Sequence, residues 1–270
     1  MIPIVEKAGG AVLVRAPVNR ILFNSAKEAC GLYNTYEKLL PKELQAMPAI
    51  QKQLSMVNHG GSGLSIFLGL NGTKEELGLK ADNYWIFSEN NYNEMLESYF
   101  KEDREESSKK MPVLFASSPS AKDSTWNERS PGKSTLTLVS FAPYEWFEEW
   151  KDEKVTNRSA EYKALKQKIE YVDAGTPLTN MHYIAAPKGE VYGIDHGMAR
   201  FNPEFTTLMR PQTPLKNLYL TGQDLFTCGF GGALAGALSC GSVILNRNLH
   251  LDAIGLAKRM KYLNKKLKGE

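Results

Sequence analysis

Short apolar runs separated by turn residues predict a series of β-strands along the first two thirds of the chain. Each run is four to seven residues long and is flanked by Gly, Pro, Asn or Ser, as is typical of strands. The predicted strands cover residues 11–15, 18–23, 64–70, 84–87, 113–116 and 135–139. A further strand starts at 29–31 but does not develop, because a helix begins directly after it at 32–35.

Apolar residues at helical spacing predict helices between and after these strands. The predicted helices are a helix end at 2–9 closed by two glycines, an exposed amphipathic helix within 89–110, and a short helix over 162–169. In the second of these, Met95, Leu96 and Tyr99 share one face, which leaves the charged residues in solvent. The chain therefore combines strands and helices rather than consisting of either alone.

The tail at 251–270 predicts a basic amphipathic helix. Leu256, Met260, Leu263 and Leu267 follow helical spacing, and the cations between them are Lys258, Arg259, Lys261, Lys265, Lys266 and Lys268. Such a helix suits an anionic membrane surface. A frayed, solvated end of the chain fits the same pattern equally well.

One glycine-rich stretch, residues 218–245, organises the C-terminal part of the chain. Residues 218–220 predict a short buried strand, 221–224 a turn, 228–232 a glycine-rich loop, and 233–245 a helix. Strand, turn, glycines and helix start in this order let a helix N-terminus approach an anionic or polar ligand. Asp224 supplies a carboxylate beside that helix start, where it can accept hydrogen bonds from ligand hydroxyl groups.

Two other interpretations of this stretch remain open. Small residues recur at every fourth position, which also suits a core helix packed closely against a neighbour; the two stripes are Gly229, Ala233, Ala237 and Gly241, and Gly232, Gly236 and Cys240. Residues 225–245 carry no charge and are long enough to span a membrane. The many Gly, Ser, Thr and Cys residues make insertion of such a span weak.

Composition narrows the class of protein only modestly. Hydrophobic residues make up 42% and charged residues 23%, which indicates a globular chain. The net charge of +3 is too small to indicate a nucleic-acid partner. Cys30, Cys228 and Cys240 form no metal or disulfide pattern, and the last two are predicted to pack as small hydrophobic residues. Met1 is not followed by a signal-peptide pattern.

No metal or nucleophile pattern accompanies the glycine-rich stretch. The four histidines include no i, i+4 pair, so a metal site is not predicted. Residues 60–63 are rich in glycine but precede a strand, which favours a plain loop over a phosphate loop. His182 and His196 are the titratable candidates near the predicted site, and each fits a structural role better than proton donation.

Several segments together resemble the phytoene-desaturase and amine-oxidase-like flavoproteins. The resemblance is carried first by 217–224 with 229–241, which is similar to the C-terminal flavin motif of that family. The other segments lie in the family's order at 31–37, 119–126, 144–150, 175–180, 186–189 and 192–193. They cover most of the chain, and no single one is decisive. The family's pattern also implies two internal gaps, near Gly31 and near 168–172.

The resemblance implies an α/β (α+β) flavoprotein fold. Residues 1–31 would be a fragment of the FAD-binding domain, 32–170 a substrate domain with a mixed sheet, and 171–270 the C-terminal part of the FAD-binding domain with the basic tail. The glycine fingerprint that holds the adenosine diphosphate half of FAD does not occur in this chain, so the implied fold lacks its N-terminal Rossmann unit. We therefore expect the chain alone to bind FAD poorly or not at all.

The resemblance also implies a chemistry. FAD is the implied cofactor, with NAD or NADP as a source of electrons, and the implied reaction saturates one double bond of retinol or a related polyene at the endoplasmic reticulum membrane. The residues that would face FAD are Gly222, Gln223, Asp224, Gly231, Gly232 and Ala233. Tyr144, Trp146, Phe147 and Trp150 would line an apolar slot for the polyene, unless they are ordinary core and surface aromatics. The alternative function is a non-catalytic isoform that binds a membrane or a partner.

Overall fold

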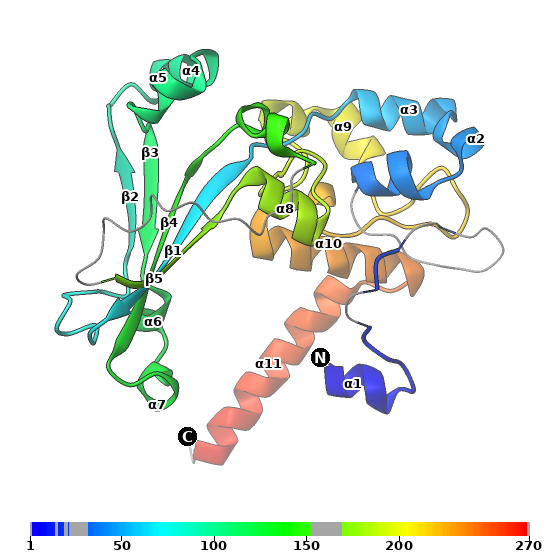
Figure 1. Cartoon of the computed structure of the whole chain (residues 1–270). Helices are drawn as coiled ribbons and strands as arrows, with labels where there is room; N and C mark the ends of the chain where they lie inside the picture. Colours follow the sequence, from blue (N-terminus) through cyan, green and yellow to red (C-terminus); the bar gives the residue numbers. More distant parts are fainter. Residues whose placement is uncertain (1, 14–15, 19–20, 22–31, 153–168, 269–270) are drawn as a thin grey trace. The chain divides into compact units, whose positions relative to one another are not determined.

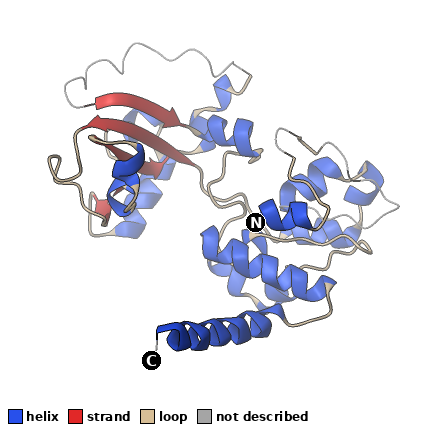
Figure 2. Cartoon of the chain, turned by 90° about the horizontal axis from the view of Figure 1, so that it is seen from below, coloured by secondary structure: helices blue, strands red, loops and turns tan. Residues whose placement is uncertain are grey.

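The computed structural model describes residues 2–13, 16–18, 21, 32–152 and 169–268 (Figure 1). These residues form two compact units. Unit 1 contains Met1–Asn58 and His196–Glu270, and unit 2 contains His59–Asp195. The sequence places domain boundaries near 31 and 170 instead, and those functional divisions stay a prediction. Figure 2 shows that the described strands belong to one unit, whereas the other is built from helices and loops.

A five-stranded antiparallel sheet forms the centre of unit 2. Its strands lie in the order β2-β3-β4-β1-β5, and every pairing between them is antiparallel. The strands are β1 (Gly63–Asn71), β2 (Asn83–Phe87), β3 (Val113–Ser117), β4 (Lys133–Phe141) and β5 (Ile169–Gly175). The structure confirms the mixed α/β class and corrects the predicted mixed sheet to an antiparallel one.

The two faces of this sheet differ in character. Opposed residues in the register share a face, and successive residues along a strand alternate between faces. One face is aliphatic, because Ala116, Leu138, Ile66 and Ala174 lie opposite one another across four strands. The same face carries Leu64, Leu68, Leu70, Leu114, Leu136 and Val172, all of them half-buried. The other face carries aromatic side chains, including the contacting pair Trp85 and Phe115.

Short helices flank the ends of the sheet (Figure 1). They are α4 (Tyr92–Lys101), α5 (Arg104–Ser108), α6 (Pro119–Lys122), α7 (Trp126–Arg129), α8 (Pro177–Ile184) and the 3₁₀ turns η2 (Tyr144–Trp146) and η3 (Glu148–Trp150). Met95 and Tyr99 of α4 are buried, which confirms the predicted amphipathic face. The predicted single helix is nevertheless two helices, because Asp103 caps the N-terminus of α5 by accepting a hydrogen bond from the amide of Glu106.

Unit 1 is helical. Its elements are α1 (Ile2–Lys7), the π-helix η1 (Asn34–Leu39), α2 (Lys42–Gln45), α3 (Pro48–Ser55), η5 (Met198–Phe201), α9 (Pro203–Leu208), η6 (Gln223–Leu225), α10 (Gly229–Ile244) and α11 (Leu249–Lys268). Its core contains Leu32, Tyr36, Ile50 and Leu220, each at most 2% exposed. Tyr36 donates a hydrogen bond of 2.7 Å to Gln53 Oε1 inside this core. The buried hydroxyl is therefore satisfied, and burial raises the pKa of Tyr36 above its ordinary value.

Helix α10 packs through its stripe of small residues. Gly232, Gly236 and Cys240 are its buried residues. A Cβ on Gly236 would lie 2.1 Å from the carbonyl oxygen of Gly222, and one on Gly232 would lie 1.6 Å from that of Thr227. Only glycine permits backbone segments to approach this closely. The second of the two predicted small-residue stripes is thus the packed face of the helix.

Several predicted elements are confirmed. They are the strands at 64–70, 84–87, 113–116 and 135–139, the helix end at 2–9, the helix start at 32–35 and the helix of the tail. Leu218 and Leu220 are buried as predicted, but their segment forms an isolated bridge between Gln212 and Tyr219 rather than a strand.

Other predicted elements are wrong or lie outside the described residues. Residues 11–13 form no strand, and Ile169 begins strand β5 rather than ending a helix. Cys240 is buried as predicted, whereas Cys228 is exposed. The remainder of the predicted strands at 11–15 and 18–23, the start at 29–31, Cys30 and the helix over 162–168 fall largely or wholly on residues that the structure does not describe.

Candidate functional site

The predicted ligand-binding turn lies in unit 1, directly before α10. Gly222 has φ 95° and ψ −167°, a backbone conformation that glycine adopts freely and that other residues rarely adopt. No atom lies within 4 Å of the position that a Cβ on Gly222 would take. The need for glycine at this position is therefore conformational rather than steric. The chain turns here into η6, which leads to the helix.

Asp224 is held inside this turn. Asp224 is only 9% exposed, and its Oδ2 accepts a hydrogen bond of 3.1 Å from the amide of Leu32. Arg200 stabilises the same turn by hydrogen bonds to its backbone. Its Nη2 donates to the carbonyl oxygens of Asp224 at 3.0 Å and Phe226 at 3.1 Å. Sequence spacing gives no signal for either contact, since Arg200 lies 24 residues away and Leu32 lies 192 residues away.

Gln223 connects the turn to the helix. Its Oε1 accepts a hydrogen bond of 2.8 Å from the amide of Gly229, the first residue of α10. The first amides of a helix lack partners within the helix, so a side-chain oxygen at this position stabilises the helix start. The structure therefore gives Gln223 a capping role in the predicted site.

Helix α10 begins earlier than the sequence predicts. The glycines at 229–232, predicted as a loop, form its first turn. Among the predicted residues of this turn, Gly231 is exposed with no atom within 4 Å of a Cβ, Gly232 is buried against Thr227, and Ala233 is half-buried. Gly231 is thus the glycine of this group where the backbone stands open to an approaching ligand.

Apolar side chains surround the exposed side of this helix start. Phe230 is 80% exposed, Phe226 58% and Leu234 47%. Residues four apart on a helix lie above one another, so Phe230 and Leu234 form one exposed ridge. The sequence pattern did not single out these side chains. The sequence signal that could have found them is that large apolar residues occupy the helix positions between the small residues.

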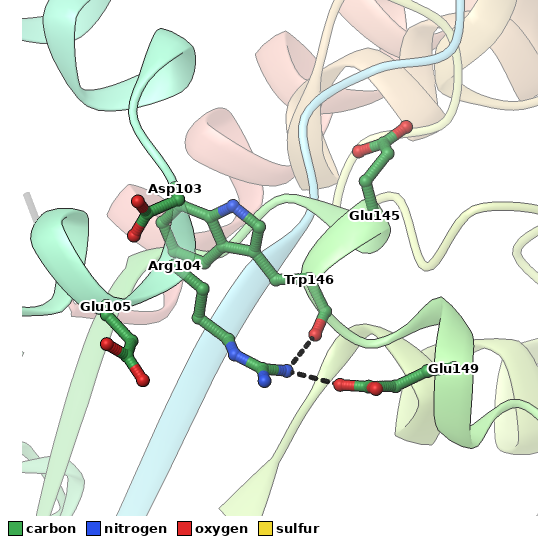
Figure 3. Close-up of a pocket in the computed structure, with 6 residues that line it drawn as sticks. All are labelled: Asp103, Arg104, Glu105, Glu145, Trp146 and Glu149. Atoms are coloured by element: carbon green, nitrogen blue, oxygen red, sulfur yellow. Dashed lines mark hydrogen bonds and ion pairs between the residues drawn. The ribbon is translucent and has the colours of Figure 1, made fainter.

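Of the aromatic residues at 144–150, Trp146 borders a polar cavity rather than an apolar one. The cavity has a volume of about 570 Å³. Figure 3 shows the residues that border it: Asp103, Arg104, Glu105, Glu145, Trp146 and Glu149. Arg104 donates to the carbonyl oxygen of Trp146 and to Glu149 Oε1, both at 2.7 Å, and its guanidinium lies 4.6 Å from the ring centre of Trp150. The lining of this cavity is mostly anionic, so the cavity does not suit a polyene, and the slot predicted for Tyr144, Phe147 and Trp150 stays a prediction.

A buried carboxylate and a histidine form a pair elsewhere in unit 2. Glu190 is 2% exposed; its Oε1 contacts Nδ1 of His59, and its Oε2 accepts from the amide of Lys188 at 2.9 Å. His182 packs edge-on against Tyr183, with ring centres 4.8 Å apart. In the described part of the chain, no three His, Cys, Asp or Glu residues are placed to hold a metal ion.

Most of the apolar stretch at 225–245 lies in helix α10. Within the described residues, no one helix combines the length and apolar character that a membrane span requires. Helices α10 and α11 reach that length and apolar character only when they are taken together, and they are bent by 113° relative to each other.

Comparison with known proteins gives the chain clear relatives. It is 63% identical to the all-trans-retinol 13,14-reductase of Danio rerio over 309 residues, which covers 99% of this chain and 51% of that protein. The protein of the same name from Homo sapiens is 40% identical, over 98% of this chain and 50% of the relative. An "inactive all-trans-retinol 13,14-reductase" of Danio rerio is 33% identical, over 97% and 50%. No known family model matches the chain.

The chain therefore spans about half the length of the curated relatives it matches. The 309 residues of the first alignment exceed the 270 residues of the chain, so at least 39 of them have no counterpart here. Internal gaps were predicted from the family resemblance, and the alignment length agrees with them. Their places near Gly31 and 168–172 stay predictions.

Proposed function

We propose that this chain, a homologue of the retinol saturases over nearly its whole length, acts in the FAD-dependent reduction of the 13,14 double bond of all-trans-retinol or a related polyene. One observation carries the proposal: 63% identity over 99% of the chain to a protein named all-trans-retinol 13,14-reductase. The proposed setting is the endoplasmic reticulum membrane, and NAD or NADP is the proposed source of electrons.

The residues of the turn and of α10 fit one edge of a flavin. The open backbone at Gly231 lies in the first turn of α10, where the helix dipole favours negative charge. Gly222 is open in the same way, and Asp224 is a carboxylate fixed next to it. FAD would supply the hydride chemistry when bound. The roles of Gly222, Gln223, Asp224, Gly231, Gly232 and Ala233 toward it are part of the proposal.

Each of these residues has a definite task in the proposal. Gly231 lets the ligand reach the helix amides, and Asp224 accepts a hydrogen bond from a ligand hydroxyl group. Gln223 and Gly232 act indirectly, because Gln223 caps the first amide of α10 and Gly232 allows the helix to pack on Thr227. The contacts of Gln223 and Gly232 hold the start of α10 in place. That helix start would stabilise negative charge at the edge of the flavin ring.

The aliphatic face of the sheet is the surface of unit 2 that suits a polyene. Its half-buried Leu and Ile side chains extend across neighbouring strands, whose spacing of about 4.8 Å makes the face about 19 Å wide over five strands. An extended hydrocarbon gains free energy by covering such a surface, at about 25 cal/mol per Å². We propose that this face, rather than the residues at 144–150, contacts the polyene and excludes water from it.

Two matched pairs of variants test the proposal in membranes that contain the chain. Gly231→Leu fills the open space at the helix start, whereas Ala237→Leu adds the same side chain at another exposed position of α10. Because the chain alone is expected to bind FAD poorly, FAD is supplied in excess, and we expect the first variant alone to lower the retained flavin, measured by its absorbance. Leu138→Asp places a charge on the aliphatic face, and Thr137→Asp places one on the opposite face. We expect the first alone to abolish the fluorescence rise of bound retinol.

Activity is measured in parallel by chromatography of 13,14-dihydroretinol after incubation with retinol and a reduced nicotinamide. The proposal is supported if 13,14-dihydroretinol is lost in Gly231→Leu and in Leu138→Asp but not in their control variants. Equal flavin and retinol binding in both members of each pair contradicts it.

A second candidate is a non-catalytic isoform that binds a membrane or a partner. One observation favours it: a relative that is 33% identical to the chain is named inactive. Retinol binding without any dihydroretinol would establish this candidate.

A further inference from the structure

Within the described residues, helix α11 contacts α10 near its N-terminal end and is exposed along most of its length. Leu249 lies against Gly241 of α10, and the two helices are bent by 113° (Figure 1). From residue 253 to residue 266 every side chain is exposed. Tertiary packing normally supplies most of the stability of a helix in a protein, and the exposed part of α11 receives little of it.

One side of α11 carries an uninterrupted apolar row, whereas the opposite side mixes apolar residues with cations. At 3.6 residues per turn, Leu249, Leu256, Met260 and Leu263 fall within an arc of about 60°. Leu256 is 61% exposed, Met260 49% and Leu263 40%. We call these three side chains the apolar stripe. An exposed apolar row along a helix marks a surface that a membrane or another protein covers.

The charge of α11 identifies what covers the stripe. Its exposed cations are Lys258, Arg259, Lys261, Lys265 and Lys266, and they lie beside or opposite the apolar stripe. Asp252 is the acidic residue in the described part of the helix, and it is paired with Arg247. Lys258, Lys261 and Lys265 follow one another at i, i+3 and i, i+4 spacing, so they repel one another in water. Nearby negative charge relieves that repulsion.

We propose that α11 lies in the surface of an anionic lipid bilayer, with the apolar stripe below the headgroups and the cations among them. Long Lys and Arg side chains flanking such a stripe reach back to the headgroup phosphates. At about 1.5 Å per residue the helix is about 30 Å long, so it makes a contact along the surface rather than at one point. The inference depends on the geometry and charge of α11, so its failure would leave the proposed reduction untouched.

The chain itself offers a matched control. Leu251, Ile254 and Tyr262 are 64%, 52% and 65% exposed, as apolar as the stripe, but lie on the opposite side of the helix. The test variant is Leu256→Ser/Met260→Ser/Leu263→Ser, and the control is Leu251→Ser/Ile254→Ser/Tyr262→Ser. A third variant, Arg259→Gln/Lys266→Gln, lowers the charge beside the stripe and keeps the stripe itself.

Binding of the full chain is measured by flotation with vesicles of phosphatidylcholine, alone or mixed with phosphatidylserine. We expect binding to the mixed vesicles, a loss of at least about 100-fold in the stripe variant, and a loss of about 25-fold in the charge variant, at about fivefold per cation. The control variant should bind within a few-fold of the parent chain. Circular dichroism should show more helix with mixed vesicles than without them.

Three outcomes would overturn the proposal. The parent chain stays in solution with phosphatidylserine vesicles in excess, or the stripe and control variants lose binding equally. Alternatively, the stripe joins two copies of this chain, which sedimentation without lipid would reveal as a dimer that the stripe variant abolishes.

Discussion

Replacing Gly236 by alanine tests how α10 is packed against the turn that precedes it. Its added Cβ would lie 2.1 Å from the carbonyl oxygen of Gly222 and 2.9 Å from the carbonyl carbon. These are backbone atoms, so no side-chain rotation removes the overlap. Forcing atoms into a well-packed site costs about 1–3 kcal/mol, and a contact this short with backbone belongs at or above the upper end of that range.

The opposing term is helix propensity, which favours alanine over glycine by about 1 kcal/mol inside a helix. We therefore expect Gly236→Ala to lower the free energy of unfolding by about 2 kcal/mol. Gly231→Ala is the matched control, because it lies in the same helix with no atom within 4 Å of its Cβ. It should raise the free energy of unfolding by about 0.5–1 kcal/mol, since the propensity gain is unopposed.

Urea unfolding followed by far-ultraviolet circular dichroism measures both variants. The midpoints should move in opposite directions relative to the parent chain at an unchanged slope. The reasoning fails if both variants stabilise the protein. That result would mean that α10 moves away from Gly222 at little cost, and that the close approach is not what fixes the turn.

Two further predictions concern buried polar groups. Burial raises the pKa of Tyr36, so above pH about 10 the unfolded chain releases a proton that the folded chain retains, and stability should fall as pH rises. Tyr36→Phe should reduce that alkaline loss, measured by urea midpoints across pH, while costing about 1–2 kcal/mol at neutral pH because Gln53 Oε1 loses its donor; an unchanged alkaline slope would contradict this. His59→Ala removes the partner of buried Glu190 and should destabilise unit 2 by roughly 3 kcal/mol. His59→Gln, which keeps a donor, should recover part of this loss by the same urea assay, and parent-like stability of His59→Ala would contradict the pairing.

The strands of unit 2 were predictable where an apolar run carried its own boundaries. Residues 64–70 and 135–139 are rich in branched aliphatic residues and lie between turn residues, and both form strands of the sheet. Strand β5 was missed, because Glu170, Asp173 and Gly175 are poor strand formers. Its pairing with β1 supplies what local propensity lacks. Residues 11–13 show the converse, since a strand-like pattern forms no strand when no partner lies beside it.

The turn of the candidate site was predictable from the sequence, but the contacts that hold this turn and α10 in place were not. A glycine followed by Gln and Asp between a buried segment and a helix indicated the turn at 221–224, and Gly222 adopts a positive φ there. The early start of α10 was missed because glycines disfavour a helix. Gln223 and the close approach to Thr227 override that preference. The bracing by Arg200 had no sequence signal, and the aromatic residues at 144–150 carry the same pattern whether they bind a ligand or pack.

The sequence left a ligand-facing helix and a close-packed core helix as competing interpretations of residues 229–244. The structure shows why the pattern indicates both. A repeat of four residues on a helix keeps one stripe on one face, so the glycines at 232 and 236 pack against backbone. Gly231, one position before Gly232, is exposed beside the exposed side chains of Phe230 and Leu234. The packed stripe fixes where the helix starts, and the open backbone at Gly231 determines what can reach that start. Variants at Gly236 and Gly231 separate these two roles: Gly236→Ala should lower stability through steric overlap, whereas Gly231→Leu should block access to the helix start without such overlap.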